Sequence, residues 1–340
     1  MKDNDPMSSV LPETELVDLV FRIFESNGMS ADNARVIARL CVAAERDGAK
    51  SHGLFRVPGY VADLRSGWVD GRAIPVVSDG VGAIVKVDAR NGYAQVALGA
   101  ARQQGIDKAH KSGSCIIAVR DSHHFGALWA DVEPFAQKSL VALAFVNSVA
   151  RMVPFGGHVP VYGTNPMALA VPRKGGEPLV FDQASSVVAF GDVLLAAQSG
   201  SQLEYGIGVD RQGAPTTDPV AVIKGGALLP FGGYKGSSIA MMVEVLSAAL
   251  TGSNFSSEVD FSAYPGAQTP KTGELVILID PAHTGAKNFE DRIEVLIANL
   301  KESGQPRLPG ERRYENRSRS LRDGIVVEKN QLESLQALIP

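Results

Sequence analysis

The chain has 340 residues, enough for about two domains and a sizeable buried core. Its 33 basic and 37 acidic residues give a net charge of −4, which excludes a general nucleic-acid-binding surface. A hydrophobic content of 45% excludes a disordered chain, and no apolar run approaches the length of a membrane span.

The first ten residues, MKDNDPMSSV, lack the apolar core of a signal sequence. The two cysteines, Cys41 and Cys115, are too few and too far apart for a metal cage. Each falls in an apolar run, which predicts two buried, inert thiols in a cytoplasmic protein.

The chain begins with predicted helices. Apolar stripes indicate helices over 14–27 and 31–47, with Ser30 as the N-cap of the second. A third helical stretch follows Gly53 and is bent or capped near Pro58.

After these helices the pattern becomes mixed. The polar, basic stretch 304–323 is predicted to be extended and exposed, and the tail to form one short strand and one short helix. Strands alternate with helices for only part of the chain, so parallel winding is not assured. Strands are predicted at 83–87, 115–119, 140–146, 168–172, 178–182 and 274–279, and helices at 92–111, 127–138, 192–199, 236–251 and 289–301.

The usual nucleotide-binding motifs are missing. The glycines of FGGYKG do not fit G-x-G-x-x-G, and the chain has neither a Walker A motif nor a G-x-S-x-G elbow. FGGYKG precedes a predicted helix, where backbone N–H groups and Lys235 can bind an anion. A plain glycine-rich helix start with a solvated lysine fits this segment equally well.

One histidine and one arginine have spacing that suits a site. His52 lies between two helical segments, and Arg56 follows four residues later, so both can face one cleft. Histidine exchanges protons near neutral pH, and arginine can clamp a carboxylate. A structural histidine beside an exposed arginine is the commoner alternative. Adjacent His123 and His124 point in different directions and no metal-ligand spacing occurs, which predicts no metal.

Two acids also stand out by position. Asp182 follows a predicted strand, and Asp192 begins a predicted helix. Such an acid can complement a helix start or orient a histidine, and the spacing leaves both roles open.

Six segments of the sequence, taken in chain order, are similar to those of a known family. Together they resemble the type-2 malate/L-lactate dehydrogenases from about residue 14 to 338. ALWADVEPFA and GVDRQGAPTTDP are similar to the branch that reduces Δ1-piperideine-2-carboxylate and Δ1-pyrroline-2-carboxylate. The family segments are SHGLFRVPGYV, DSHHFGALW, VYGTNPMALAVP, LVFDQASS, LLPFGGYKGSSIAMMVEVL and LPGERR.

The resemblance implies an α+β, mixed, non-Rossmann oxidoreductase fold with a helical domain and a largely antiparallel-sheet cofactor domain. Residues 1–75, joined by 305–340, are expected to form the helical domain, and 76–304 the mixed α/β cofactor-binding domain. It also implies a homodimer that acts on a small molecule, with no nucleic-acid or membrane partner.

The resemblance also assigns site residues. His52 is similar to the family's proton donor, and Ser51 and Asp192 to the groups that hydrogen-bond and tune it. Arg56 and Thr164 match substrate-contacting positions. Cofactor-binding positions are matched by His124, Phe125, Gly126, Ala127, Leu128, Asp182, Gln183, Ala184, Tyr234, Lys235 and Arg292.

The activity so implied is reduction of a cyclic ketimine carboxylate by NADPH, or alternatively NADH, to L-pipecolate or L-proline. Asp192 stands where hydroxy-acid dehydrogenases of this type more often carry lysine, which favours imine chemistry. This carboxylate is expected to raise the pKa of His52. The alternatives are an NAD(P)-dependent 2-hydroxy-acid dehydrogenase of malate or lactate type and a catalytically silent small-molecule binding protein.

Overall fold

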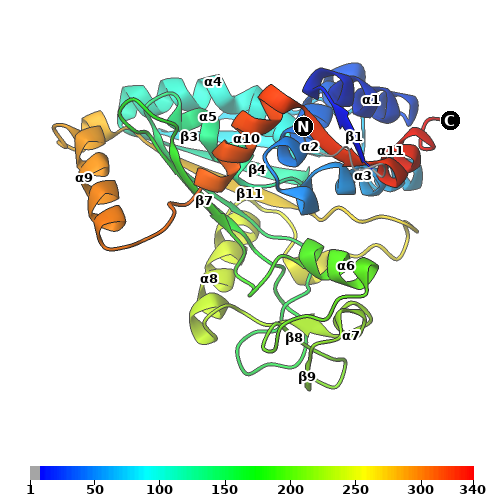
Figure 1. The fold of residues 1–340 in the computed structure, drawn as a ribbon. Coiled ribbons are helices and arrows are strands. Elements are labelled where there is room, and N and C mark those ends of the chain that lie inside the picture. The colour runs from blue at the N-terminus through cyan, green and yellow to red at the C-terminus, as the bar shows by residue number, and fades with distance from the viewer. Residues whose placement is uncertain (1–7) are drawn as a thin grey trace.

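The computed structural model describes residues 8–340 as a helical layer, a seven-stranded sheet with covering helices, and a smaller lobe below the sheet (Figure 1). Residues 1–7, which include most of the segment examined for a signal sequence, lie outside the described residues. None of the described helices is both long and apolar enough to cross a bilayer.

The helical layer joins the two ends of the chain. Helices α1 (Glu13–Ser26) and α2 (Ala31–Arg46) pack through their apolar stripes, as predicted. The Ser30 hydroxyl accepts a hydrogen bond from the Asn33 N–H at 3.4 Å, which confirms the predicted N-cap. Strand β1 (Ser8–Leu11) pairs antiparallel with β12 (Ile325–Glu328), so the C-terminal tail completes this layer.

Short turns connect α2 to the next helix. The 3-10 turns η1 (Lys50–His52) and η2 (Leu54–Arg56) lead into α3 (Val57–Ser66), with Pro58 in its first turn. These turns hold the two residues whose spacing suggested a site. Helix α11 (Lys329–Gln336) ends the layer, so the tail forms the predicted strand and helix.

The central sheet is mixed. Its strand order is β2-β3-β4-β11-β5-β6-β7. Within residues 8–340, β3 and β4 pair in parallel, and the other five pairs of neighbouring strands in this sheet are antiparallel. The strands are β2 (Val76–Asp79), β3 (Ile84–Tyr93), β4 (Ser114–His123), β5 (Val141–Val146), β6 (Met167–Val171), β7 (Leu179–Gln183) and β11 (Lys271–Ile279).

Helices cover the sheet and bury its core. Helices α4 (Ala94–Ser112) and α5 (Trp129–Ala136) pack on it, and α5 contacts the β5–β7 half. Helix α8 (Tyr234–Glu244) and its π-helical continuation (Val245–Ala249) contact β5 and β11 from the side of the lobe (Figure 1). The predicted burial of both cysteines is confirmed, and both are free thiols.

The lobe has a small core of its own, which includes Met152, Val193 and Leu228. Helix α6 (Phe190–Ser199) confirms the helix predicted at 192–199. The other short elements of the lobe are β8 (Gly208–Val209), β9 (Pro215–Thr216), α7 (Pro219–Ile223) and β10 (Ala227–Leu228).

The prediction that 304–323 is extended is wrong, because Glu311–Asp323 forms helix α10. No residue of α10 is classed as buried, so it lacks the apolar stripe that reveals other helices. Polar contacts hold it instead: the Tyr314 hydroxyl donates to the Pro178 carbonyl at 3.0 Å, and Arg317 pairs with Asp47. The remaining elements are η4 (Ser256–Glu258), η5 (Pro281–His283) and α9 (Phe289–Glu302).

Candidate active site

A cavity of about 410 Å³ lies between the helical layer, the sheet and the lobe. Its walls come from η1 and η2, the loops after β4 and β5, and the start of α6. Among the described residues that line it there is no aspartate, glutamate or lysine. The polar and charged lining residues are His52, Arg56, His124, Ser148, Arg151, Thr164 and Gln268.

His52 is held by its neighbour in the turn. Its Nδ1 shares a hydrogen bond of 3.2 Å with the Ser51 hydroxyl, which leaves Nε2 as the nitrogen able to exchange a proton with a ligand. Burial, together with the nearby Arg56 and His124, lowers the pKa of His52 to about 3. The imidazole is therefore neutral at ordinary pH unless another charge enters the cavity.

Asp192 does not act on His52 as expected. It lies exposed in the first turn of α6, and no hydrogen bond to His52 is found among residues 8–340. The expectation that this carboxylate raises the pKa of His52 is wrong, because burial lowers that pKa and the nearby Arg56 and His124 lower it further. Asp192 acts on Arg56 instead, where its charge favours the protonated guanidinium.

Arg56 is fixed beside His52 and points a cation into the cavity. Its Nε donates to the Ser51 carbonyl at 2.7 Å, and its guanidinium lies 4.2 Å from the centre of the Phe125 ring. Burial lowers its pKa to about 10, while Tyr60 and Asp192 oppose this shift. The guanidinium remains charged at neutral pH and no described carboxylate forms an ion pair with it.

The start of α6 approaches this turn closely. A Cβ at Gly191 would lie 2.9 Å from Arg56 Nη2 and 3.0 Å from Ser51 Cβ. Both contacts are tight, so a side chain here would press on Arg56 and Ser51, and glycine lets α6 approach this turn closely.

Arg151 is a lining residue that sequence reasoning missed. It follows β5 in an irregular loop, and its guanidinium lies 4.8 Å from the centre of the Phe190 ring. Burial lowers its pKa. A strand followed by a loop is a common place for site residues, but no motif marked this arginine.

His124 connects the cavity to a buried polar cluster. Its Nε2 shares a hydrogen bond of 2.7 Å with Asp131, and one ligand atom from each of His124, Asp131 and Glu274 lies within 4.8 Å of the others. Both Glu274 oxygens are buried without a hydrogen-bond partner, and burial and Asp131 raise its pKa well above its usual value. A protonated, neutral Glu274 accounts for the cluster, and the absence of a metal stays a prediction.

The first predicted cofactor segment reaches the cavity in part. Phe125 and Gly126 line it with His124, whereas Ala127 and Leu128 are buried in the sheet core. Sequence spacing alone did not separate lining residues from core residues in this loop.

The second predicted cofactor segment lies beside the first. Asp182, at the end of β7, accepts a hydrogen bond of 2.8 Å from the Trp129 backbone N–H. Burial raises the pKa of Asp182 to about 6, although this hydrogen bond and Arg313 oppose the shift. Gln183 is exposed and Ala184 is partly exposed, and neither lines the cavity with His52.

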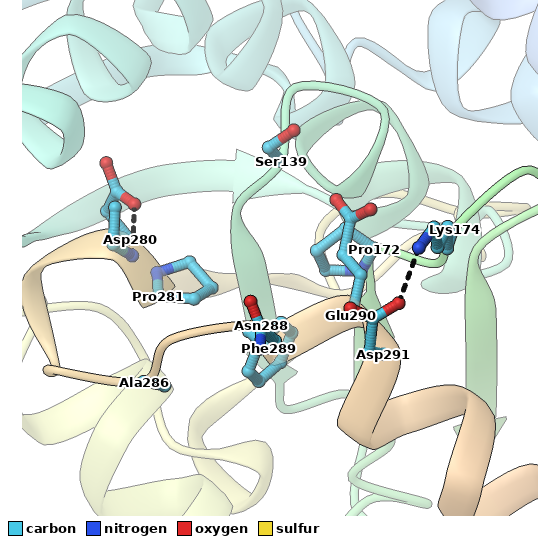
Figure 2. A pocket seen from close by; sticks show the side chains of 11 residues that line it. Ser139, Pro172, Lys174, Asp280, Pro281, Ala286, Asn288, Phe289, Glu290 and Asp291 are labelled. Carbon is cyan, nitrogen blue, oxygen red and sulfur yellow. Dashed lines mark hydrogen bonds and ion pairs between the residues drawn. The ribbon is translucent and has the colours of Figure 1, made fainter.

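Three further predicted cofactor residues lie outside this cavity. Tyr234 and Lys235 are exposed in the first turn of α8, with the Tyr234 ring 6.3 Å from Phe155. Arg292 is exposed on α9. The preceding residue, Asp291, lines a separate cavity of about 330 Å³ and pairs with Lys174 at 2.7 Å (Figure 2). The described structure does not bring these residues to His52.

Comparisons with known proteins agree with one another. The malate/L-lactate dehydrogenase family model matches residues 11–336. The chain is 54% identical over 334 residues to a Delta(1)-pyrroline-2-carboxylate/Delta(1)-piperideine-2-carboxylate reductase of Pseudomonas syringae pv. tomato, covering 98% of this chain and 97% of that protein. A (2R)-3-sulfolactate dehydrogenase (NADP(+)) of Chromohalobacter salexigens is 42% identical over 310 residues, with 91% and 92% covered.

A solved structure supports the same relationship. The crystal structure of delta1-piperideine-2-carboxylate reductase from Pseudomonas syringae pvar. tomato matches with a TM-score of 0.95 at 55% identity. The match covers 97% of this chain and 99% of the other.

Proposed function

The chain belongs to the malate/L-lactate dehydrogenase family, and from this premise we propose how its cleft works. The protein is an oxidoreductase that reduces Δ1-piperideine-2-carboxylate and Δ1-pyrroline-2-carboxylate, giving L-pipecolate and L-proline. The observation that carries the proposal is the placement of Arg56 beside His52 in a cavity whose described lining contains no carboxylate. Such a cavity selects a small anion that also accepts a proton.

Arg56 binds the substrate carboxylate. Its Nε is occupied by the Ser51 carbonyl, so its terminal nitrogens are the donors available to the ligand. Thr164 lines the same cavity and adds a hydroxyl donor at a site fixed by its backbone N–H, which donates to Ser148 Oγ at 3.3 Å. Together these groups orient the flat imine ring in the cleft.

His52 gives the proton to the ring nitrogen. The substrate carboxylate offsets the positive charge of Arg56, which is one cause of the low pKa of His52. Binding therefore raises the pKa of the imidazole and makes it a competent acid only when substrate is present. Ser51 acts as the positioning residue, since its hydroxyl holds Nδ1 and directs Nε2 to the ligand.

The loop after β4 and the end of β7 are suited to hold NADPH, which supplies the hydride when bound. Next to Asp182 the chain leaves buried donors unused: the indole N–H of Trp129 and Nε and Nη2 of Arg313 have no hydrogen-bond partner among the described residues. The Arg313 guanidinium lies 4.6 Å from the centre of a Trp129 ring. Unsatisfied donors and a cation at this place fit a polar, anionic cofactor.

The wider architecture is proposed with it. Residues 1–75 with 305–340 act as the helical domain, and 76–304 act as the cofactor domain, whose five antiparallel strand pairs favour a sheet outside the doubly wound class. The active form is a homodimer. Light scattering on the protein as it elutes from a size-exclusion column measures its mass. A fully active enzyme with the mass of a monomer would reject the proposed homodimer.

Oxidation of NADPH and of NADH at 340 nm tests the function. Both imine carboxylates are assayed beside pyruvate and oxaloacetate, with His52→Ala as the variant. We expect fast turnover of the imines, slow turnover of the keto acids, a preference for NADPH, and a loss of about 10²- to 10⁴-fold in the variant. Preferential turnover of the keto acids, or a His52→Ala enzyme within a few-fold of wild type, would reject the proposal.

A further inference from the structure

The cleft contains a second guanidinium that the proposed reaction does not use. Arg151 lines the same cavity as Arg56 and belongs to the loop after β5. Its backbone is fixed on both sides, because its N–H donates to the Tyr162 carbonyl at 2.8 Å and its carbonyl accepts from the Leu228 N–H at 2.7 Å. The side chain therefore extends from a rigid support.

Arg151 has no anionic partner within residues 8–340. Its contact is the Phe190 ring, whereas Arg173, at the outer end of the sheet, pairs with Glu294 through two hydrogen bonds of 2.9 Å. A largely buried cation without a counter-charge costs free energy, so proteins keep one where a ligand supplies the charge.

The two cleft arginines flank one short piece of backbone. The Arg151 guanidinium covers the ring of Phe190, and the position of a Cβ on the next residue, Gly191, lies 2.9 Å from Arg56 Nη2. The wall beside this step is apolar, with Leu194 and Ile223. A ligand that bridges the two cations would thus carry two anionic groups joined by a small ring whose carbon atoms can pack on this apolar wall.

We propose that Arg151 forms a second anion subsite and that the cleft also reduces cyclic imine dicarboxylates. This inference rests on the proposed function. One carboxylate binds Arg56, as in the monocarboxylate reaction, and the other pairs with Arg151. The reduced nicotinamide gives a hydride to the imine carbon, the C=N electron pair moves to nitrogen and takes the proton from His52, and both carboxylates leave unchanged.

A matched pair of substrates tests the subsite. The first is Δ1-piperideine-2-carboxylate, and the second carries one more carboxylate on the other ring carbon bonded to nitrogen. We would measure kcat/KM for both, and KM for NADPH, in wild type, Arg151→Met and Arg151→Lys. Arg120→Met is the control, because Arg120 is an exposed arginine that pairs with Asp88 at the surface.

We expect the ratio of dicarboxylate to monocarboxylate kcat/KM to fall about 10- to 100-fold in Arg151→Met, as for a lost charge-assisted hydrogen bond. In Arg151→Lys this ratio should fall less than in Arg151→Met, and in Arg120→Met it should equal that of wild type. The test rests on the ratio and not on the absolute turnover of either substrate, because Arg151 lines the cavity that binds both.

Three results would overturn the subsite. The first is a wild-type enzyme that reduces the monocarboxylate but not the dicarboxylate. The second is an equal fall in kcat/KM for both substrates in Arg151→Met, which would assign Arg151 to the carboxylate that both share. The third is a higher KM for NADPH in Arg151→Met with an unchanged ratio of the two kcat/KM values. If wild type reduces neither imine, the proposed function itself fails, and the two failures are distinguishable.

Discussion

Two partly buried arginines in this molecule have opposite surroundings. At the junction of α2, α5 and α10, Arg317 donates to Asp47 at 2.7 Å and to Glu133 at 3.1 Å. Burial alone would lower its pKa, but these hydrogen bonds outweigh burial and raise it. In the cleft, Arg56 has an aromatic ring and a carbonyl as neighbours, and burial lowers its pKa to about 10.

From this difference we infer which arginine stabilises the fold and which arginines are available to bind a ligand. Arg317 has its counter-charges within the chain, so its charge is satisfied before any ligand binds. Neither Arg56 nor Arg151 forms an ion pair with a described carboxylate, and Asp192 acts on Arg56 only from a distance, so we infer that an anionic ligand completes them. We infer that paired charge stabilises the fold and that the unpaired charge in the cleft is available to a ligand.

The largest effect should come from Arg56→Met. We expect kcat/KM for Δ1-piperideine-2-carboxylate to fall about a thousandfold, since removing one partner of a buried, hydrogen-bonded charge pair costs about 2–5 kcal/mol. Steady-state kinetics measures this loss, with Arg120→Met as the control. Retention of wild-type kcat/KM would show that the substrate carboxylate binds elsewhere.

Arg317→Met should damage stability rather than activity. It leaves Glu133 buried without its cation and leaves Asp47 paired with Arg46 alone. We expect a loss of about 2–3 kcal/mol, below the range for a fully buried pair because Arg317 is partly exposed and Asp47 keeps one partner. Chemical denaturation measures the loss, and Arg322→Met, exposed on the same helix, should change little. A destabilisation no greater than that of the control would contradict the pairing.

The pKa of His52 should rise when a carboxylate binds. The cavity holds it at about 3 through burial, Arg56 and His124, and an anion on Arg56 removes part of this positive potential. Histidine NMR titration with and without an unreactive aromatic ring carboxylate should show an upward shift of about one unit or more, or about 1.4 kcal/mol. His52→Gln assigns the resonance, and a downward shift would contradict the account.

The smallest effect is expected for Asp192→Asn. Because Asp192 is exposed and favours the charge of Arg56 from a distance, its loss should lower kcat/KM about threefold, as for a screened surface interaction. Kinetics of Asp192→Asn measures the effect, with Asp210→Asn as the control because Asp210 is a partly exposed loop aspartate that does not line the cavity. A loss approaching that of His52→Ala would restore a direct role on the imidazole.

The sequence predicted features that follow local rules and missed those set by distant charges. Apolar stripes placed α1 and α2, and Ser30 marked the start of α2. Helix α10 was missed because its contacts are polar, as in Arg317 with Asp47, a residue far away in the chain.

The candidate site was predicted unevenly for similar reasons. His52 and Arg56 share one short segment, so their spacing was enough to bring them to one cavity. Arg151 carries no motif, and its position depends on how the loop after β5 packs on Phe190. The exposed position of Asp192 depends on how α6 meets η1, which one sequence does not specify.

The most direct test of the central claim is the unfolding free energy of the ligand-free protein with each arginine replaced by methionine. Unpaired cleft charge should cost stability, so Arg56→Met and Arg151→Met should unfold at the same or higher denaturant than wild type. Arg317→Met should unfold at lower denaturant. If Arg56→Met and Arg151→Met lose as much as Arg317→Met, the cleft arginines are structural and the account is wrong.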